Sequence, residues 1–120
     1  MADVIVTVPK RLWEDWIGEG DAAGVPPTGG EWVFWTWGSE PQIKPGERVY
    51  IVAHGKLRGY APLTRLVFEG PQAGLGRIGF VRRAEAVAVT IATPIRGFRG
   101  FRYRWWDRND EIPFAEWRTP

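Results

Sequence analysis

The chain has no cysteine among its 120 residues. This absence excludes disulfide frameworks, thiolate metal sites, CxxC redox motifs and cysteine nucleophiles. The single histidine, His54, excludes paired-histidine metal sites and the HExxH motif. No apolar run approaches the roughly 20 residues that a bilayer-crossing helix needs, and the N-terminal residues lack the pattern of a signal peptide. We therefore expect a cytoplasmic protein in a reducing compartment, with no membrane association, no metal and no cofactor.

Lysine is also scarce, with 3 lysines against 13 arginines and a net charge of only +2. The distribution of charge says more than its sum. Residues 1–43 carry 2 basic and 7 acidic side chains, whereas residues 77–108 carry 8 arginines against Glu85 and Asp107. Such asymmetry predicts an electropositive patch, provided that the arginines share a face.

The apolar content, 44% hydrophobic and 14% aromatic residues, is sufficient for one core. We expect a single domain over residues 1–120, without repeats or linkers. A β-branched run predicts a strand over residues 3–8, and apolar spacing predicts an amphipathic helix over 10–18. Residues 19–30, rich in glycine and proline, form either a lid or a simple connection. Further strands are expected over 31–37, 48–53, 57–66, 77–82, 85–92 and 101–106.

The predicted hairpin of residues 48–66 has an arguable register. A three-residue connection of His54, Gly55 and Lys56 separates apolar from polar positions, which two-residue turns would mix. This register pairs Ala53 with Leu57, Ile51 with Gly59, and Val49 with Ala61. It gathers two cations and two amphipathic rings on the opposite face: Arg48, Tyr50, Arg58 and Tyr60.

About six strands with one or two short helices predict a mainly β (α+β) fold, a small and partly closed β-barrel. The segment KPGERVYIVAHGKLRGYA, residues 44–61, resembles the PUA-like superfamily, and its ASCH branch most closely. The matching positions are Lys44, Gly46, Glu47, Val49, Gly59 and Ala61.

The resemblance covers residues 3–68 and implies a PUA-like barrel that recognises RNA, modified bases or nucleotide-like ligands. The tetrapeptide GSEP at residues 38–41 is similar to one in the EVE branch, although there it follows the first strand. Some ASCH proteins resemble enzymes. The motif G-x-K-x-x-E-x-R, common in ASCH domains after the first helix, is replaced here by EGDAAGVPP. The resemblance therefore gives no support for amidohydrolase activity.

The densest functional pattern is IRGFRGFRYRWWDR, residues 95–108, where five arginines interleave with five aromatic residues. Arginine offers phosphate forks and planar stacking, and aromatic rings offer faces for bases. Strand alternation would place Arg102, Arg104 and Trp106 together with Arg108, opposite Phe101, Tyr103 and Trp105. We expect Arg102, Arg104, Trp106 and Arg99 to bind the ligand. The alternative is an ordinary edge strand with a solvated face.

Other candidates lie on earlier strands. Trp35 and Trp37 form either one wall of a base-stacking slot or part of the core. The hairpin adds Arg48, Arg58, Tyr60 and Lys56, whose alternative role is a cross-strand ladder.

The sequence thus favours a module that binds RNA, single-stranded DNA or a nucleotide-like ligand. One alternative is a phage or bacterial regulator that docks on a protein partner, since tryptophan and arginine are also enriched at protein interfaces. A second is a hydrolase acting on a modified nucleoside, using Lys44 or Lys56 with Glu47. No nucleophile and base are paired in the sequence, so we predict no catalytic residues and no enzymatic activity.

Overall fold

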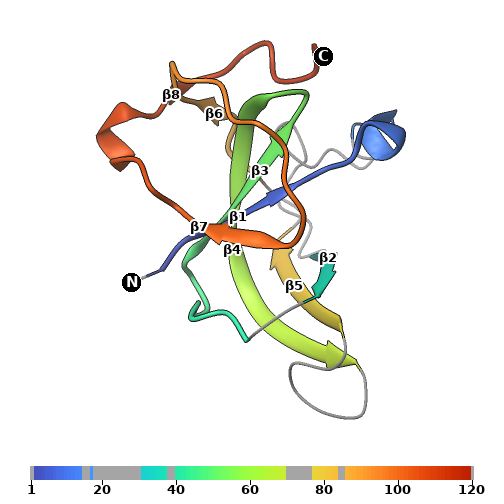
Figure 1. Ribbon diagram of the computed structural model, residues 1–120. Coiled ribbons are helices and arrows are strands. Elements are labelled where there is room, and N and C mark those ends of the chain that lie inside the picture. The colour runs from blue at the N-terminus through green and yellow to red at the C-terminus, as the bar shows by residue number, and fades with distance from the viewer. Residues whose placement is uncertain are drawn as a thin grey trace.

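A computed structural model describes residues 2–14, 17, 31–37, 40–69, 77–83 and 86–119 (Figure 1). The fold is mainly β, as expected, and a curled six-stranded mixed sheet forms a half-barrel. The elements are β1 (Val4–Thr7), η1 (Lys10–Leu12), β2 (Glu31–Trp37), β3 (Arg48–Ala53), β4 (Lys56–Glu69), β5 (Arg77–Arg83), β6 (Val89–Thr90), β7 (Phe101–Tyr103), η2 (Arg108–Asp110) and β8 (Ile112–Pro113).

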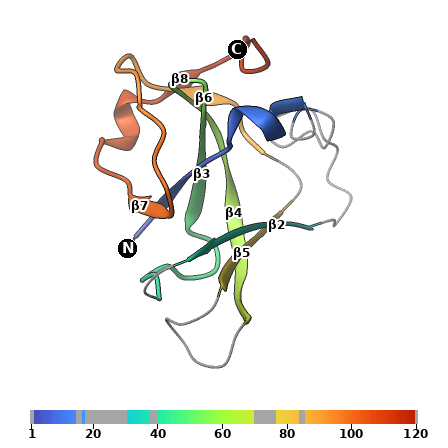
Figure 2. The same ribbon diagram turned by 45° about the vertical axis from the view of Figure 1, so that its right-hand side comes forward.

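The sheet has the strand order β2-β5-β4-β3-β1-β7, and its one parallel pair is β1 with β3. The 14-residue strand β4 joins the two halves, because it pairs with β3 first and with β5 later. A register shift between Leu63 and Arg65 marks the change of partner. Such bulges bend a strand and increase its twist, which lets one strand serve both halves. Figure 2 shows β2 and β5 on the half of β4 away from its turn with β3.

Strands β1 and β3 are buried on both faces. Val4 and Val6 of β1 belong to the core inside the half-barrel, together with Phe80. Ile5 points the other way, into a second core that includes Ile95 and Trp106. Residues 91–98 and Trp106 therefore cover the outer face of the sheet. This double burial explains why the two strands are continuous apolar runs instead of alternating ones.

The turn between β3 and β4 is shorter than the expected three-residue connection. His54 and Gly55, with φ of 49° and 73°, have the positive φ pair of a two-residue type I′ turn. The pairs of Val49 with Ala61 and Ile51 with Gly59 are confirmed. The pair of Ala53 with Leu57 is wrong, because Ala53 lies opposite Lys56.

The reason is a bulge that the sequence pattern does not show. Val52 pairs with Leu57 and Ile51 pairs with Gly59, so Arg58 is an extra residue between two successive pairs. A bulged residue is redirected relative to regular alternation. Arg58 consequently does not join Arg48 on the face where it was expected.

Other elements match in part. The strand expected over 31–37 is confirmed, and the one expected over 3–8 is present as β1. Of the helix expected over 10–18, the structure describes η1 and a helical Trp13, while residues 15, 16 and 18 lie outside the described residues. The strands expected over 85–92 and 101–106 shorten to β6 and β7. The expected loop of residues 19–30 also lies outside the description. No helix in the described ranges is long and apolar enough to cross a bilayer.

We predict that His54→Asn retains the hairpin and flattens the response to acid. Asparagine tolerates positive φ, whereas β-branched His54→Val should cost about 1–2 kcal/mol. Burial, with smaller effects of the charges of Arg58 and Lys10, lowers the pKa of His54 below 6.5. A lowered histidine pKa gives stability that is complete above the unfolded pKa and lost as pH falls below it.

Thermal unfolding between about pH 7.5 and about pH 5.5 measures both effects. The wild type should lose more Tm over this interval than His54→Asn. Equal losses would contradict the assignment of the pH dependence to His54.

Candidate nucleic-acid interface

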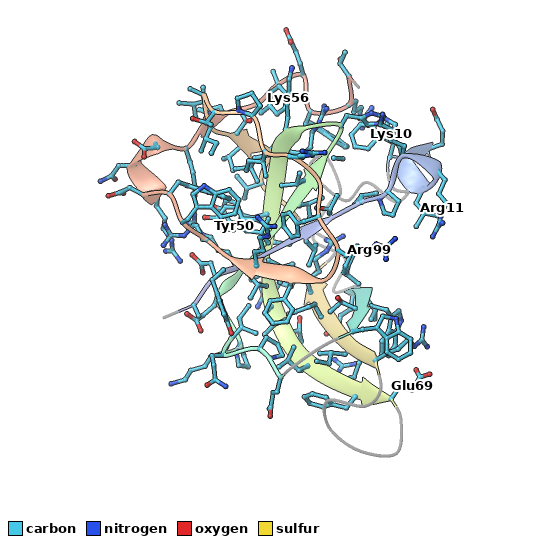
Figure 3. The ribbon with its side chains drawn as sticks, in the orientation of Figure 1. Lys10, Arg11, Tyr50, Lys56, Glu69 and Arg99 are labelled. Carbon is cyan, nitrogen blue, oxygen red and sulfur yellow. The ribbon has the colours of Figure 1, made fainter. Side chains whose placement is uncertain are left out.

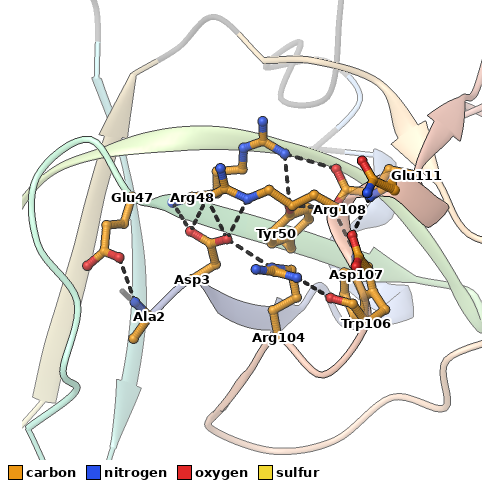
Figure 4. A network of polar contacts seen from close by, with 11 residues as sticks. Ala2, Asp3, Glu47, Arg48, Tyr50, Arg104, Trp106, Asp107, Arg108 and Glu111 are labelled. Carbon is orange, nitrogen blue, oxygen red and sulfur yellow. Dashed lines mark hydrogen bonds and ion pairs between the residues drawn. The ribbon is translucent and has the colours of Figure 1, made fainter.

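A buried carboxylate at the start of β1 organises the residues around it (Figure 4). The Asp3 side chain is 2% exposed and accepts hydrogen bonds from Arg104 Nε at 2.9 Å and Arg108 Nη2 at 2.8 Å. The backbone N–H of Arg48 donates to it at 2.9 Å. Burial alone would raise the pKa of Asp3, but the bonds from Arg48, Arg108 and Arg104 outweigh it and hold the pKa below 3.8. Asp3 is therefore an ionised anchor for the arginines.

A second carboxylate, Glu111, continues this network. It accepts from Arg48 Nη1 at 2.9 Å, from the Tyr50 hydroxyl at 2.5 Å and from Trp106 Nε1 at 2.9 Å. Arg48 also stacks on Tyr60, with Cζ 4.0 Å from the ring centroid. Burial, reinforced by the bond to Glu111, raises the pKa of Tyr50, so its hydroxyl stays protonated and donates.

Four predicted ligand-binding residues thus lie in or against this network. The expected strand alternation does not extend over residues 104–108, because β7 ends at Tyr103. Arg104, Trp106 and Arg108 nevertheless come together, bonded to Asp3 and Glu111, while Arg102 stays exposed apart from them. Trp106 is only 8% exposed. Together with Arg48 and Tyr60, these side chains join β1, β3 and the segment 104–111.

Arg58, another predicted residue, is fully buried. It donates to the backbone carbonyls of Ala53 at 2.9 Å, Trp117 at 3.1 Å and Thr119. Its guanidinium lies 5.0 Å from the ring centroid of Trp13. The residue therefore ties the C-terminal segment to the hairpin.

Trp35 and Trp37 lie on the outer face of β2, because Phe34 packs toward the core and Thr36 is buried between them. The Trp35 ring rests against Gly79, where an added Cβ would lie 3.0 Å from it. Arg77 covers this ring, with Cζ 4.3 Å from its centroid. Trp37 stands at the end of the strand and is 65% exposed.

The remaining predicted residues, Lys56, Arg99 and Arg102, are exposed and belong to a larger group. We call this group the basic band; it comprises Lys10, Arg11, Lys56, Arg96, Arg99 and Arg102, all of them exposed. Within the described ranges, none of the six forms an ion pair.

Backbone contacts bring the segments of the band together. The Ile95 N–H donates to the Gly55 carbonyl at 2.9 Å, which sets Arg96 near the hairpin turn. The Phe98 N–H donates to Thr7 Oγ1 at 3.3 Å, and Arg102 lies opposite Ile5 in the β1–β7 pair. Figure 3 shows Lys10, Arg11 and Arg99 on the same side of the molecule. The band therefore runs from the β3–β4 turn along β1 to β7.

Sequence reasoning did not single out Lys10, Arg11 or Arg96. Arg96 lies within residues 95–108, whose pattern of arginines and aromatic residues already indicated a binding surface. Lys10 and Arg11 belong to the acidic first third of the chain, so segment charge counts conceal them. Only the contact between Thr7 and Phe98 joins them to the arginines.

The residues considered for hydrolase activity, Lys44, Lys56 and Glu47, do not form one site. Both oxygens of Glu47 accept backbone N–H groups, from Ala2 and Lys44, at 2.5 and 2.8 Å. Lys44 lines an open cavity of about 600 Å³ beside the N-terminal residues, whereas Lys56 lies on the basic band. Among the described residues, no three histidine or carboxylate side chains are grouped to hold a metal ion.

No family model matches this chain, and no curated protein or solved structure does. Function is therefore inferred from the basic band and the residues beside it. Arginine and lysine side chains without carboxylate partners can donate hydrogen bonds to phosphate oxygens, and arginine can donate two parallel ones.

We predict that Asp3→Asn destabilises the fold by about 2–3 kcal/mol. Removing one partner of a fully buried ion pair costs roughly 3–5 kcal/mol, and the loss here is smaller because the Arg108 side chain is 40% exposed. The lowered Asp3 pKa gives stability that is present above the unfolded pKa and lost as pH falls through the folded pKa.

Urea unfolding at about pH 7 and about pH 3 tests this assignment. The gap between wild type and Asp3→Asn should narrow in acid, because the wild-type carboxylate is then being protonated. Glu40→Gln, which changes an exposed carboxylate, serves as the control and should change stability by less than about 0.5 kcal/mol. A gap that is independent of pH would contradict the role of the Asp3 charge.

Proposed function

We propose that this protein binds nucleic acid and that the basic band holds the phosphates. The observation that carries the proposal is the band itself: six exposed cations, without carboxylate partners among the described residues, on segments that contact one another. Ordinary solvated faces mix charges of both signs. A predominantly positive surface, here with Glu14 as an exposed carboxylate near Lys10 and Arg11 in sequence, attracts a polyanion over long range. Binding then gains free energy from the release of counterions condensed on the polyanion.

The band contains groups for more than charge attraction. Four of its six members are arginines, which match phosphate geometry better than lysines do. Arg102 lies over the Phe98 ring, with Cζ 4.6 Å from the centroid. This contact restricts the Arg102 side chain before a ligand binds, so less of its conformational entropy is lost on binding.

The buried network around Asp3 and Glu111 fixes the position of segments that carry the basic band. It fixes Arg104 to Asp3, one residue beyond β7, so the strand that carries Arg102 is held at both of its ends. Its three guanidiniums also exceed its two carboxylates by one positive charge. The resemblance to PUA-like domains points toward the same class of ligand.

Binding should be measured by fluorescence anisotropy with labelled RNA and DNA at about 50 and about 200 mM salt. If four phosphates of a single strand are engaged, at a slope of about 0.7 per phosphate, the wild type should bind about 50-fold more weakly at the higher salt. Arg99→Ala combined with Arg102→Ala should weaken binding about tenfold or more and reduce the slope of log K against log salt by about 1.4.

The control removes the same amount of charge elsewhere. Lys44→Ala combined with Arg65→Ala alters two exposed cations outside the band and should leave affinity within about twofold. Absence of wild-type binding at low salt would overturn the proposal, as would equal losses in the two double variants.

A further inference from the structure

Trp37 lies directly beside the basic band. An added Cβ at Gly100 would meet Thr36 Oγ1 at 3.6 Å and the Trp37 carbonyl oxygen at 3.8 Å, so the Gly100 backbone lies close to the end of β2. Figures 1 and 2 both show β2 beside the start of β7. Arg99 immediately precedes this contact. The end of an aromatic strand therefore meets the arginine-bearing turn.

Trp37 differs from its neighbour Trp35 in having an available ring. Trp35 is packed between Gly79 and Arg77, whereas Trp37 is 65% exposed. Within the described part of the chain, Trp37 has neither a ring contact nor a cation stacked on it. The Trp37 ring is therefore available to stack on another planar group.

We propose that Trp37 stacks on an unpaired base of a strand whose phosphates lie on the basic band, which makes single-stranded nucleic acid the ligand. This inference rests on the proposed function and narrows its substrate class. In a duplex, both faces of every internal base are covered by neighbouring base pairs, so a side chain at the surface cannot stack on them. A single strand exposes its bases and bends to reach both surfaces.

The combination of the Trp37 ring with Arg99 favours a nucleic-acid strand over a protein partner. The charged side chains of the neighbouring β4–β5 surface already compensate one another, since Arg77 pairs with Glu69 at 2.8 Å and Arg65 pairs with Glu31 at 2.8 Å. Two charged side chains near Trp37 form no ion pair among the described residues: Arg99, next to the Gly100 contact, is positive, and Glu40, three residues further along the chain, is negative. An aromatic ring next to unpaired arginine is the combination that holds a base and its phosphate together.

The test compares strands of about 12 nucleotides: single-stranded RNA, single-stranded DNA, a blunt DNA duplex and a DNA strand of abasic sites. The wild type should bind both base-bearing single strands at least tenfold more tightly than the duplex. Trp37→Ala should weaken binding to them about 5- to 150-fold and leave the duplex and the abasic strand within twofold. Comparable losses with RNA and DNA identify stacking; a loss with one of them only identifies a sugar contact instead and overturns the inference.

Trp105→Ala is the matched control, because Trp105 is also a surface tryptophan, 55% exposed. It should leave single-strand affinity within twofold, and Trp37→Phe should retain most of the wild-type affinity. Circular dichroism of each variant confirms that it folds. If Arg99→Ala with Arg102→Ala loses binding while Trp37→Ala changes nothing, the single-strand inference fails and the proposed function stands. If the wild type binds none of the four probes, the proposed function itself fails.

Discussion

The ion pairs of Asp3 with Arg104 and Arg108 fix how the outer segments meet the sheet. One carboxylate at the start of β1 holds two guanidiniums from beyond β7 and the backbone of β3. A buried carboxylate is costly unless its lone pairs are used, and here they accept bonds from three residues. Residues 91–98 and Trp106 can therefore pack over Ile5 and Val52 while the Asp3 carboxylate stays paired.

The same network decides which arginines are free to act. Of the five arginines in residues 95–108, Arg104 and Arg108 are held by Asp3. The other three, Arg96, Arg99 and Arg102, remain exposed on the basic band. Three exposed arginines are thus followed by two buried-network arginines within one short segment, and what distinguishes the last two is their contact with a single aspartate about 100 residues earlier in the chain.

Much of the fold follows from local sequence, whereas the site depends on long-range contacts. β-branched and aromatic runs predict β2, β3 and most of β4, because burial and strand propensity agree there. The position of Arg58 could not be predicted, since a bulge changes alternation without a signal in composition. Arg104 and Trp106 were expected to bind the ligand because of their residue types. Their burial could not be predicted, because Asp3, the partner of Arg104, is distant in sequence, and Glu111, the partner of Trp106, follows the η2 turn.

The charge count over residues 77–108 predicted a group of exposed arginines, whereas the count over residues 1–43 did not predict the surface charge of that segment. The first 43 residues are strongly acidic, which suggests that they would neutralise a basic neighbour. Yet Asp3 is used inside the network, Glu31 pairs with Arg65, and Lys10 and Arg11 of the same segment stand on the basic band. A net charge of +2 is therefore compatible with six cations on one band that form no ion pair among the described residues, because carboxylates such as Asp3 and Glu31 are engaged by other arginines. What a polyanion meets is the local field of the band, not the sum over the chain.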